Sequence, residues 1–155
     1  FHVGFKVVRG AYMEKERERA MQKGYISPVQ INKKATDDDY NAGVAFCIEH
    51  IDKMHLFVGT HNEYSCMNAI ALIQEKGIAA DSEQVFFSQL YGMSDNISYN
   101  LSNNNYNVAK YLPFGPVYDV VPYLIRRAQE NTSVAGQTNR ELDLLDKELK
   151  RRRSK

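Results

Sequence analysis

The sequence predicts an α/β protein built on parallel strands. Short apolar runs of strand length alternate with longer amphipathic runs that have helical spacing. This alternation recurs four times within 155 residues, as expected for parallel strands joined by helical crossovers. Both a flavodoxin-like sheet and a piece of a (β/α)8 barrel fit this pattern. A whole barrel takes roughly 250 residues, so four units make about half of one.

Apolar runs and chain breakers define each predicted element. The predicted strands cover residues 2–8 (HVGFKVV), 55–59, 84–88 and 108–112. The predicted helices cover residues 13–23, 40–51, 64–76, 94–101, 117–131 and 139–151. Gly24 and Gly77 end two of these helices, and Thr36 with three following Asp residues offers a helix start. Residues 25–35 are expected to form a loop, and Pro122 to mark a first turn or a kink.

Composition excludes several classes of protein. The fractions of hydrophobic (43%) and charged (25%) residues are ordinary for a globular domain, and no apolar run approaches the roughly 18 residues of a membrane span. Cys47 and Cys66 lack zinc-ligand spacing, so reduced core thiols are expected. Neither GxGxxG nor GxxxxGK[ST] occurs. The chain starts FHVGFKVVRG, without Met or a leader, and we expect it to be a fragment or a processed product.

Polar residues directly after the strands are the candidates for chemistry, because sites of parallel α/β folds lie there. His61 could serve as a base, a metal ligand or a cofactor contact, and the alternative is a structural histidine held by hydrogen bonds. Lys6 lies within an apolar strand and points either into a barrel lumen or to water. Arg126 and Arg127 form a fork for a carboxylate or phosphate, or else part of an exposed salt-bridged helix face.

Six ordered segments resemble the proline dehydrogenase family. They are Lys6–Tyr12 (KVVRGAY), Thr36-Asp37, Thr60-His61-Asn62, 89–93 (QLYGM), 111–117 (YLPFGPV) and 123–131 (YLIRRAQEN). The resemblance covers residues 5 to about 131. It implies a flavoenzyme on a distorted (β/α)8 barrel, of which residues 1–137 are the C-terminal half and residues 138–155 a charged helix with a basic tail. The activity implied is oxidation of L-proline to Δ1-pyrroline-5-carboxylate, with hydride passing from proline C5 to N5 of FAD and electrons passing on to a quinone-type acceptor.

The resemblance also implies residue roles. The implied catalytic residues are Tyr111, Tyr123, Arg126 and Arg127, where the arginines bind the proline carboxylate and the tyrosines form the aromatic wall. Ala11, Tyr12 and Leu90 are implied to contact the substrate. The implied FAD contacts are Lys6, Gly10, Lys33, Thr36, His61, Asn62 and Glu130, and no metal is expected. Lys6 is a lysine where several relatives carry arginine. The first half of the barrel, with further site residues, is not in this chain.

Two other functional classes are kept beside this one. A noncatalytic half-barrel would bind a partner or a complementing N-terminal half through its open edges and tend to oligomerise. An anion-binding module would use the arginine pair and the basic tail, residues 147–155. The tail contains no aromatic residue on which a base could stack, which argues against nucleic acid as the anion. The expected location is cytoplasmic, with peripheral association at the inner membrane, or mitochondrial if the source is eukaryotic.

Overall fold

Four parallel strands form one sheet in the order in which they occur along the chain. In this computed structural model the strands are β1 (Val3–Val7), β2 (Met54–Gly59), β3 (Val85–Leu90) and β4 (Val108–Tyr111), and the order is β1-β2-β3-β4. Each crossover therefore returns to the adjacent position on the same side. A flavodoxin-like sheet places later strands on both sides of the first strand. Sequential order is that of a barrel segment, so the predicted barrel-type α/β fold is confirmed.

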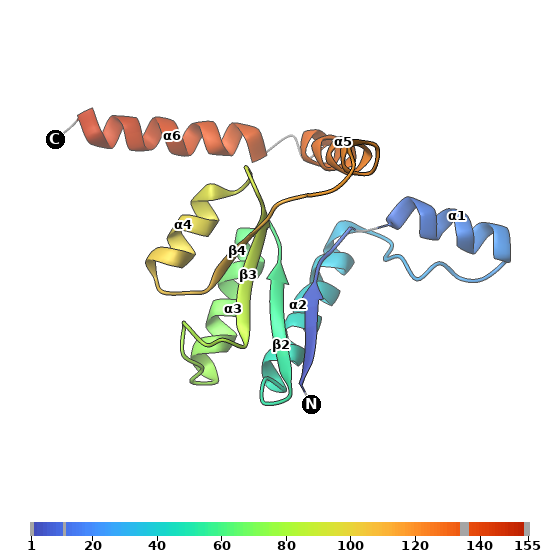
Figure 1. Cartoon of the computed structure of the whole chain (residues 1–155), viewed down its shortest axis with the longest axis horizontal. Coiled ribbons are helices and arrows are strands. Elements are labelled where there is room, and N and C mark those ends of the chain that lie inside the picture. Colours follow the sequence, from blue (N-terminus) through green and yellow to red (C-terminus); the bar gives the residue numbers. More distant parts are fainter. Residues whose placement is uncertain (1, 11, 134–136, 154–155) are drawn as a thin grey trace. The chain divides into compact units, whose positions relative to one another are not determined.

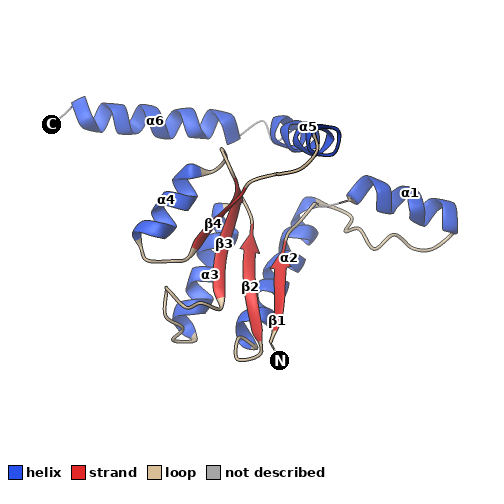
Figure 2. Ribbon diagram, viewed as in Figure 1, coloured by secondary structure: helices blue, strands red, loops and turns tan. Residues whose placement is uncertain are grey.

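Six helices are found in the part of the chain that the structure describes, which is residues 2–10, 12–133 and 137–153. Of residues 128–133 and 137–141 only the backbone is described. The helices are α1 (Met13–Lys23), α2 (Lys33–Glu49), α3 (Glu63–Glu75), α4 (Asp95–Asn103), α5 (Val117–Ser133) and α6 (Gln137–Arg153). Figure 1 follows them along the chain, and Figure 2 separates helices from strands. The predicted units, four strands each followed by helix plus a last helix, are confirmed.

The core lies between one face of the sheet and helices α2, α3 and α4. Val44 and Ile48 of α2 and Ile73 of α3 pack with the strand residues Leu56 and Phe87, and all five are at most 1% exposed. Because side chains alternate along a strand, Leu56 and Phe87 face the helices while their neighbours face the other way. We call that second side the open face of the sheet. Cys47 and Cys66 are buried free thiols, as predicted, and burial raises the pKa of both.

Helix α2 begins earlier than the sequence predicted. Asn32 is its N-cap, and its side-chain oxygen accepts a hydrogen bond from the Ala35 N–H at 2.8 Å. The expectation of a loop up to residue 35 and a cap at Thr36 was wrong. Lys33 pairs with Asp37 and Lys34 pairs with Asp38, both at i,i+4 spacing. The acidic residues therefore stabilise the first turns of the helix through ion pairs and do not cap its start.

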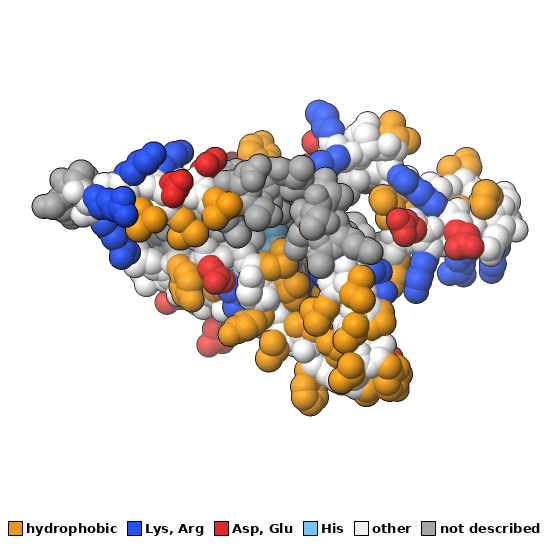
Figure 3. Space-filling model, turned by 90° about the horizontal axis from the view of Figure 1, so that it is seen from above, with side chains coloured by type: hydrophobic (Ala, Val, Ile, Leu, Met, Phe, Trp, Pro, Cys, Tyr) orange, Lys and Arg blue, Asp and Glu red, His pale blue; other side chains and the backbone are white. Residues whose placement is uncertain are grey.

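The chain divides into two compact units, Phe1–Leu112 and Pro113–Lys155. The first contains the sheet with α1 to α4, and the second contains α5 and α6. Helix α5 continues through Pro122. The last turn of α6 contains Arg151, Arg152 and Arg153, which are all exposed, and Figure 3 shows in blue the Lys and Arg side chains of one face. The functional boundary at residue 137 stays a prediction. None of the described helices is long and apolar enough to cross a membrane.

Candidate functional site

The open face of the sheet carries a lysine and a tyrosine from its two edge strands. Strand register places Lys6 beside Phe57, and Leu90 beside Tyr111. The Lys6 ammonium lies 4.7 Å from the centroid of the Tyr111 ring. The two residues belong to β1 and β4, which are separated by two strands at about 4.8 Å spacing. Their contact requires the open face to be concave, as the inner wall of a barrel is.

Gly59 leaves the space that Lys6 occupies. A Cβ at residue 59 would lie 2.7 Å from Val8 Cγ1, 2.9 Å from the Val7 carbonyl oxygen and 3.3 Å from Lys6 Cε. The first two distances are shorter than a real side chain tolerates. Glycine at this strand end therefore allows β1 to approach β2 closely and allows the lysine stem to cross the open face. The sequence placed Gly59 in a predicted strand but gave it no role in the site, although its place before Thr60-His61-Asn62 was a signal.

His61 is held by protein groups through both ring nitrogens. Nδ1 lies 2.9 Å from the Ser94 hydroxyl, and Nε2 accepts a hydrogen bond from the Leu90 N–H at 3.4 Å. Burial lowers the pKa of His61 from its usual 6.5, and the nearby Lys110 ammonium lowers it further. The neutral imidazole therefore joins the end of β2 to the end of β3, next to the predicted substrate contact Leu90. Its predicted contact with cofactor stays a prediction.

Asn62 has a structural task at the start of α3. Its side-chain oxygen accepts a hydrogen bond from the Ser65 N–H at 3.0 Å and caps the helix. Its own N–H donates to the Thr60 hydroxyl at 3.1 Å. We call residues 60–62 the THN turn. Two local hydrogen bonds hold this turn, one at the Asn62 N–H and one at its side-chain oxygen, and the turn contains the predicted cofactor contacts His61 and Asn62.

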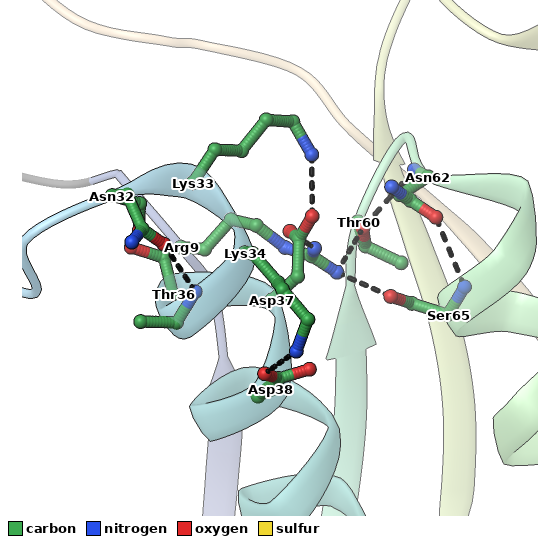
Figure 4. A network of polar contacts seen from close by, with 11 residues as sticks. Arg9, Asn32, Lys33, Lys34, Thr36, Asp37, Asp38, Thr60, Asn62 and Ser65 are labelled. Carbon is green, nitrogen blue, oxygen red and sulfur yellow. Dashed lines mark hydrogen bonds and ion pairs between the residues drawn. The ribbon is translucent and has the colours of Figure 1, made fainter.

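The start of α2 supplies two more predicted cofactor residues, Lys33 and Thr36, and Figure 4 shows them beside the THN turn. Lys33 forms an ion pair with Asp37. The Thr36 hydroxyl donates to the Asn32 carbonyl oxygen at 3.1 Å. Burial alone would raise the pKa of Asp37, but hydrogen bonds from Lys33 and Arg9 outweigh it, so the pKa lies below its usual value. Asp37 is thus a carboxylate shared by two cations.

Arg9 connects these two parts of the site, and sequence reasoning assigned it no role. It pairs with Asp37, and its Nη2 donates to the Ser65 hydroxyl at 2.5 Å and to the Thr60 hydroxyl at 3.3 Å. Its guanidinium lies 3.9 Å above the Tyr40 ring. Its position directly after an apolar strand was the available signal.

The segment after β1 holds three predicted pocket residues. Gly10 has φ of 77°, a left-handed conformation that glycine adopts readily, and Tyr12 follows it with φ of 59°. Tyr12 is 72% exposed and precedes α1. Ala11 lies outside the described residues. The turn directs Tyr12 away from the core, so it is accessible to a ligand.

The predicted carboxylate-binding residues lie on α5, in the second unit. The Arg127 guanidinium carbon is 5.3 Å from the centroid of the Tyr123 ring, as their i,i+4 spacing predicts. Arg126 is exposed, whereas Tyr123 and Arg127 are half-buried. The side chain of Glu130 lies outside the described residues. The structure therefore brings together Tyr123 with Arg127, Lys6 with Tyr111, and His61 with Leu90. The role of every predicted site residue stays a prediction.

Among the described residues, no three His, Cys, Asp or Glu side chains cluster as potential metal ligands. The open face of the first unit carries one pair of a cation and an aromatic ring, Lys6 with Tyr111, and α5 of the second unit separately carries another, Arg127 with Tyr123. Such groups bind anionic and flat ring systems. The chemistry available is orientation of an organic substrate or cofactor, with charge stabilisation.

Comparison with known proteins identifies the family. The family model for proline dehydrogenase matches residues 1–140. Proline dehydrogenase 1, mitochondrial, of Caenorhabditis elegans is 45% identical over 98% of this chain and 26% of its own length. Hydroxyproline dehydrogenase of Xenopus laevis is 46% identical over 96% of this chain and 33% of its own length. The chain thus spans about a quarter to a third of these curated relatives.

Solved structures agree with the sequence matches. Proline utilization A from Bdellovibrio bacteriovorus, inactivated by N-propargylglycine, superimposes with a TM-score of 0.76 at 29% identity, over 83% of this chain and 13% of that one. A Bradyrhizobium japonicum proline utilization A mutant gives a TM-score of 0.72 at 26% identity, over 84% of this chain and 13% of that one. The match runs through both units and through every predicted site segment, and by it this chain belongs to the proline dehydrogenase family.

Proposed function

We propose that this chain supplies the C-terminal half of an FAD-dependent barrel that oxidises L-proline to Δ1-pyrroline-5-carboxylate. Family membership supports the reaction class. The observation that carries the proposal is the Lys6–Tyr111 contact across a concave sheet face, at the strand ends where barrel sites lie. The small share of the relatives' length that the chain spans supports a second half, supplied by further residues or by a complementing subunit.

The residues present fit a flavin. The concave face offers flat apolar contact through Phe57 and Phe86, whose rings stack at 4.9 Å, and a cation from Lys6 above Gly59, where a Cβ would not fit. We assign Lys6, Gly10, His61 and Asn62 to the ring side of FAD, and Lys33 and Thr36 to its phosphate side. Glu130 completes the assigned set. FAD supplies the acceptor that takes a hydride at N5. Lys6 supplies positive charge near the ring, which favours the reduced anionic form.

The second unit binds the substrate in this proposal. Arg126 and Arg127 bind the proline carboxylate through charge-assisted hydrogen bonds and so fix the ring for reaction. Tyr123, Tyr111, Tyr12, Ala11 and Leu90 wall the pocket. Oxidation removes a hydride from C5 and the proton on the ring nitrogen, which leaves a C5=N double bond. The apolar wall favours the neutral amine, whose lone pair the hydride loss requires.

The partners follow from the same reaction. The electrons pass from the reduced flavin to an acceptor, for which a quinone is the proposed class. Three relatives are described as mitochondrial, from Caenorhabditis elegans, Homo sapiens and Arabidopsis thaliana, and they support a mitochondrial location over a cytoplasmic one. Because other relatives are named hydroxyproline dehydrogenase, hydroxyproline is the alternative substrate to be tested beside proline.

The decisive experiment is a dye-reduction assay on the complete enzyme with FAD. We expect turnover with L-proline, and inactivation by N-propargylglycine that excess proline prevents. Lys6→Met is expected to weaken FAD retention, and the exposed Lys53→Met, far along the chain in the turn before β2, serves as the matched control. Turnover with hydroxyproline but not with L-proline would mean that hydroxyproline is the substrate. Absence of both flavin binding and turnover would refute the proposal.

A further inference from the structure

Arg9 lies where four elements meet, namely β1, α2, β2 and α3. It follows β1, its ion-pair partner Asp37 belongs to α2, and its hydroxyl acceptors Thr60 and Ser65 lie at the end of β2 and in α3. Figure 4 shows these groups converging from the two helix starts. Most of the Arg9 side chain is enclosed, with 19% exposed. A charge in that setting needs partners in fixed places.

Several contacts fix the orientation of the guanidinium. The Asp37 carboxylate binds Nη1, and the guanidinium carbon lies 3.9 Å from the centroid of the Tyr40 ring, over its face. The remaining Nη2 edge is therefore aimed at Ser65 and Thr60. A lysine could keep the ion pair, but it has neither the planar face nor the forked donors. The arrangement is specific to arginine.

The two residues whose hydroxyls Arg9 binds also bond to Asn62 of the THN turn. The Thr60 hydroxyl also accepts the Asn62 N–H, and the Ser65 N–H donates to the Asn62 side chain. Arg9 thus bonds to the two residues that hold Asn62, and these lie on either side of the segment that carries His61. Through Asp37 it also bonds to the partner of Lys33. One guanidinium spans the distance between the ring-side and phosphate-side groups of the proposed cofactor site.

We infer that Arg9 is a positioning residue, which holds the THN turn and the start of α2 at the spacing that FAD binding requires. Its two terminal nitrogens bind protein groups, and its Nε is buried without a hydrogen-bond partner among the described residues, so we place its action on Thr60, Ser65 and Asp37 and not on the cofactor itself. The cofactor part of this inference rests on the proposed function, whereas the ordering of the turn does not.

The test compares Arg9→Lys and Ser65→Ala with wild type in the complete enzyme. Lys34→Met is the matched control, because it removes an exposed i,i+4 ion pair of the same helix outside the network. Two quantities are measured: hydrogen exchange at the Asn62 and Ser65 amides, and the dissociation constant for FAD. We expect both variants to exchange faster and to bind FAD about tenfold more weakly, as for one charge-assisted hydrogen bond lost. The control should match wild type.

Unchanged exchange and unchanged FAD affinity in both variants would overturn the inference. A lower unfolding temperature with wild-type FAD affinity would also overturn it, since a merely stabilising residue gives that result. If Arg9→Lys does not fold, the exchange rates and the FAD affinity of Ser65→Ala decide whether the inference holds. If the wild-type enzyme binds no FAD, the proposed function falls, and the exchange rates alone decide whether Arg9 orders the turn.

Discussion

Gly59→Ala tests whether close approach of β1 to β2 shapes the open face. The added Cβ would lie 2.7 Å from a Val8 methyl and 2.9 Å from the Val7 carbonyl oxygen. The methyl can rotate, but the carbonyl belongs to β1, which is paired in register with β2. Relief of the clash must therefore move β1 and with it Lys6.

Such overpacking costs about 1–3 kcal/mol, and displacement of Lys6 from Tyr111 adds about 0.5–1 kcal/mol. Alanine regains part of this, because glycine in a strand is about 0.5–1 kcal/mol worse than alanine. The expected net loss in the free energy of unfolding is about 2 kcal/mol. We also expect weaker FAD retention, since Lys6 moves with its strand.

Urea unfolding of the complete flavin-free enzyme measures this loss. Gly43→Ala is the matched control, because a Cβ there meets only a Val7 methyl at 4.0 Å and lies inside α2. Alanine favours a helix over glycine, so the control should be neutral or stabilised by up to about 1 kcal/mol. Equal stability of Gly59→Ala and wild type would show that β1 does not approach β2 in this way.

Three further outcomes are expected. Arg126→Met and Arg127→Met should each raise KM for proline, by an amount equivalent to the loss of about 1.5–3 kcal/mol of binding free energy. Unchanged kcat/KM in both variants would contradict the proposal that these arginines bind the proline carboxylate. Because the folded state lowers the pKa of His61, the stability it contributes is complete above pH 6.5 and declines as pH falls below that value. Unfolding in urea at about pH 7.5 and about pH 5 should therefore show a smaller pH dependence in His61→Asn than in wild type, and equal slopes would contradict the lowered pKa. Residues 1–155 alone should give no proline-dependent dye reduction, because half of a barrel lacks part of its site, and full turnover by a 17.8 kDa monomer in sedimentation would contradict the barrel mapping.

Local patterns were sufficient to predict the elements. The predicted helix over residues 13–23 is α1, and Gly24 ends it with φ of 70°. The other strands and helices were predicted to within a few residues, except at α2. There the acidic run after Thr36 resembled a cap, while Asn32 supplies the actual one. Several polar residues compete for that role locally, and in the structure Asp37 lies inside the helix, where it pairs with Arg9.

The sequence by itself determined the alternation of strands and helices, the family and the predicted site residues, because these depend on local spacing and on ordered motifs. The tertiary structure decided the strand order β1-β2-β3-β4, which selects a barrel segment over a flavodoxin-like sheet. It also decided which side chains meet. Lys6 reaches Tyr111 from 105 positions earlier in the chain, and Arg9 reaches Ser65. Contacts between residues so far apart depend on sheet curvature and helix packing, which no local pattern encodes.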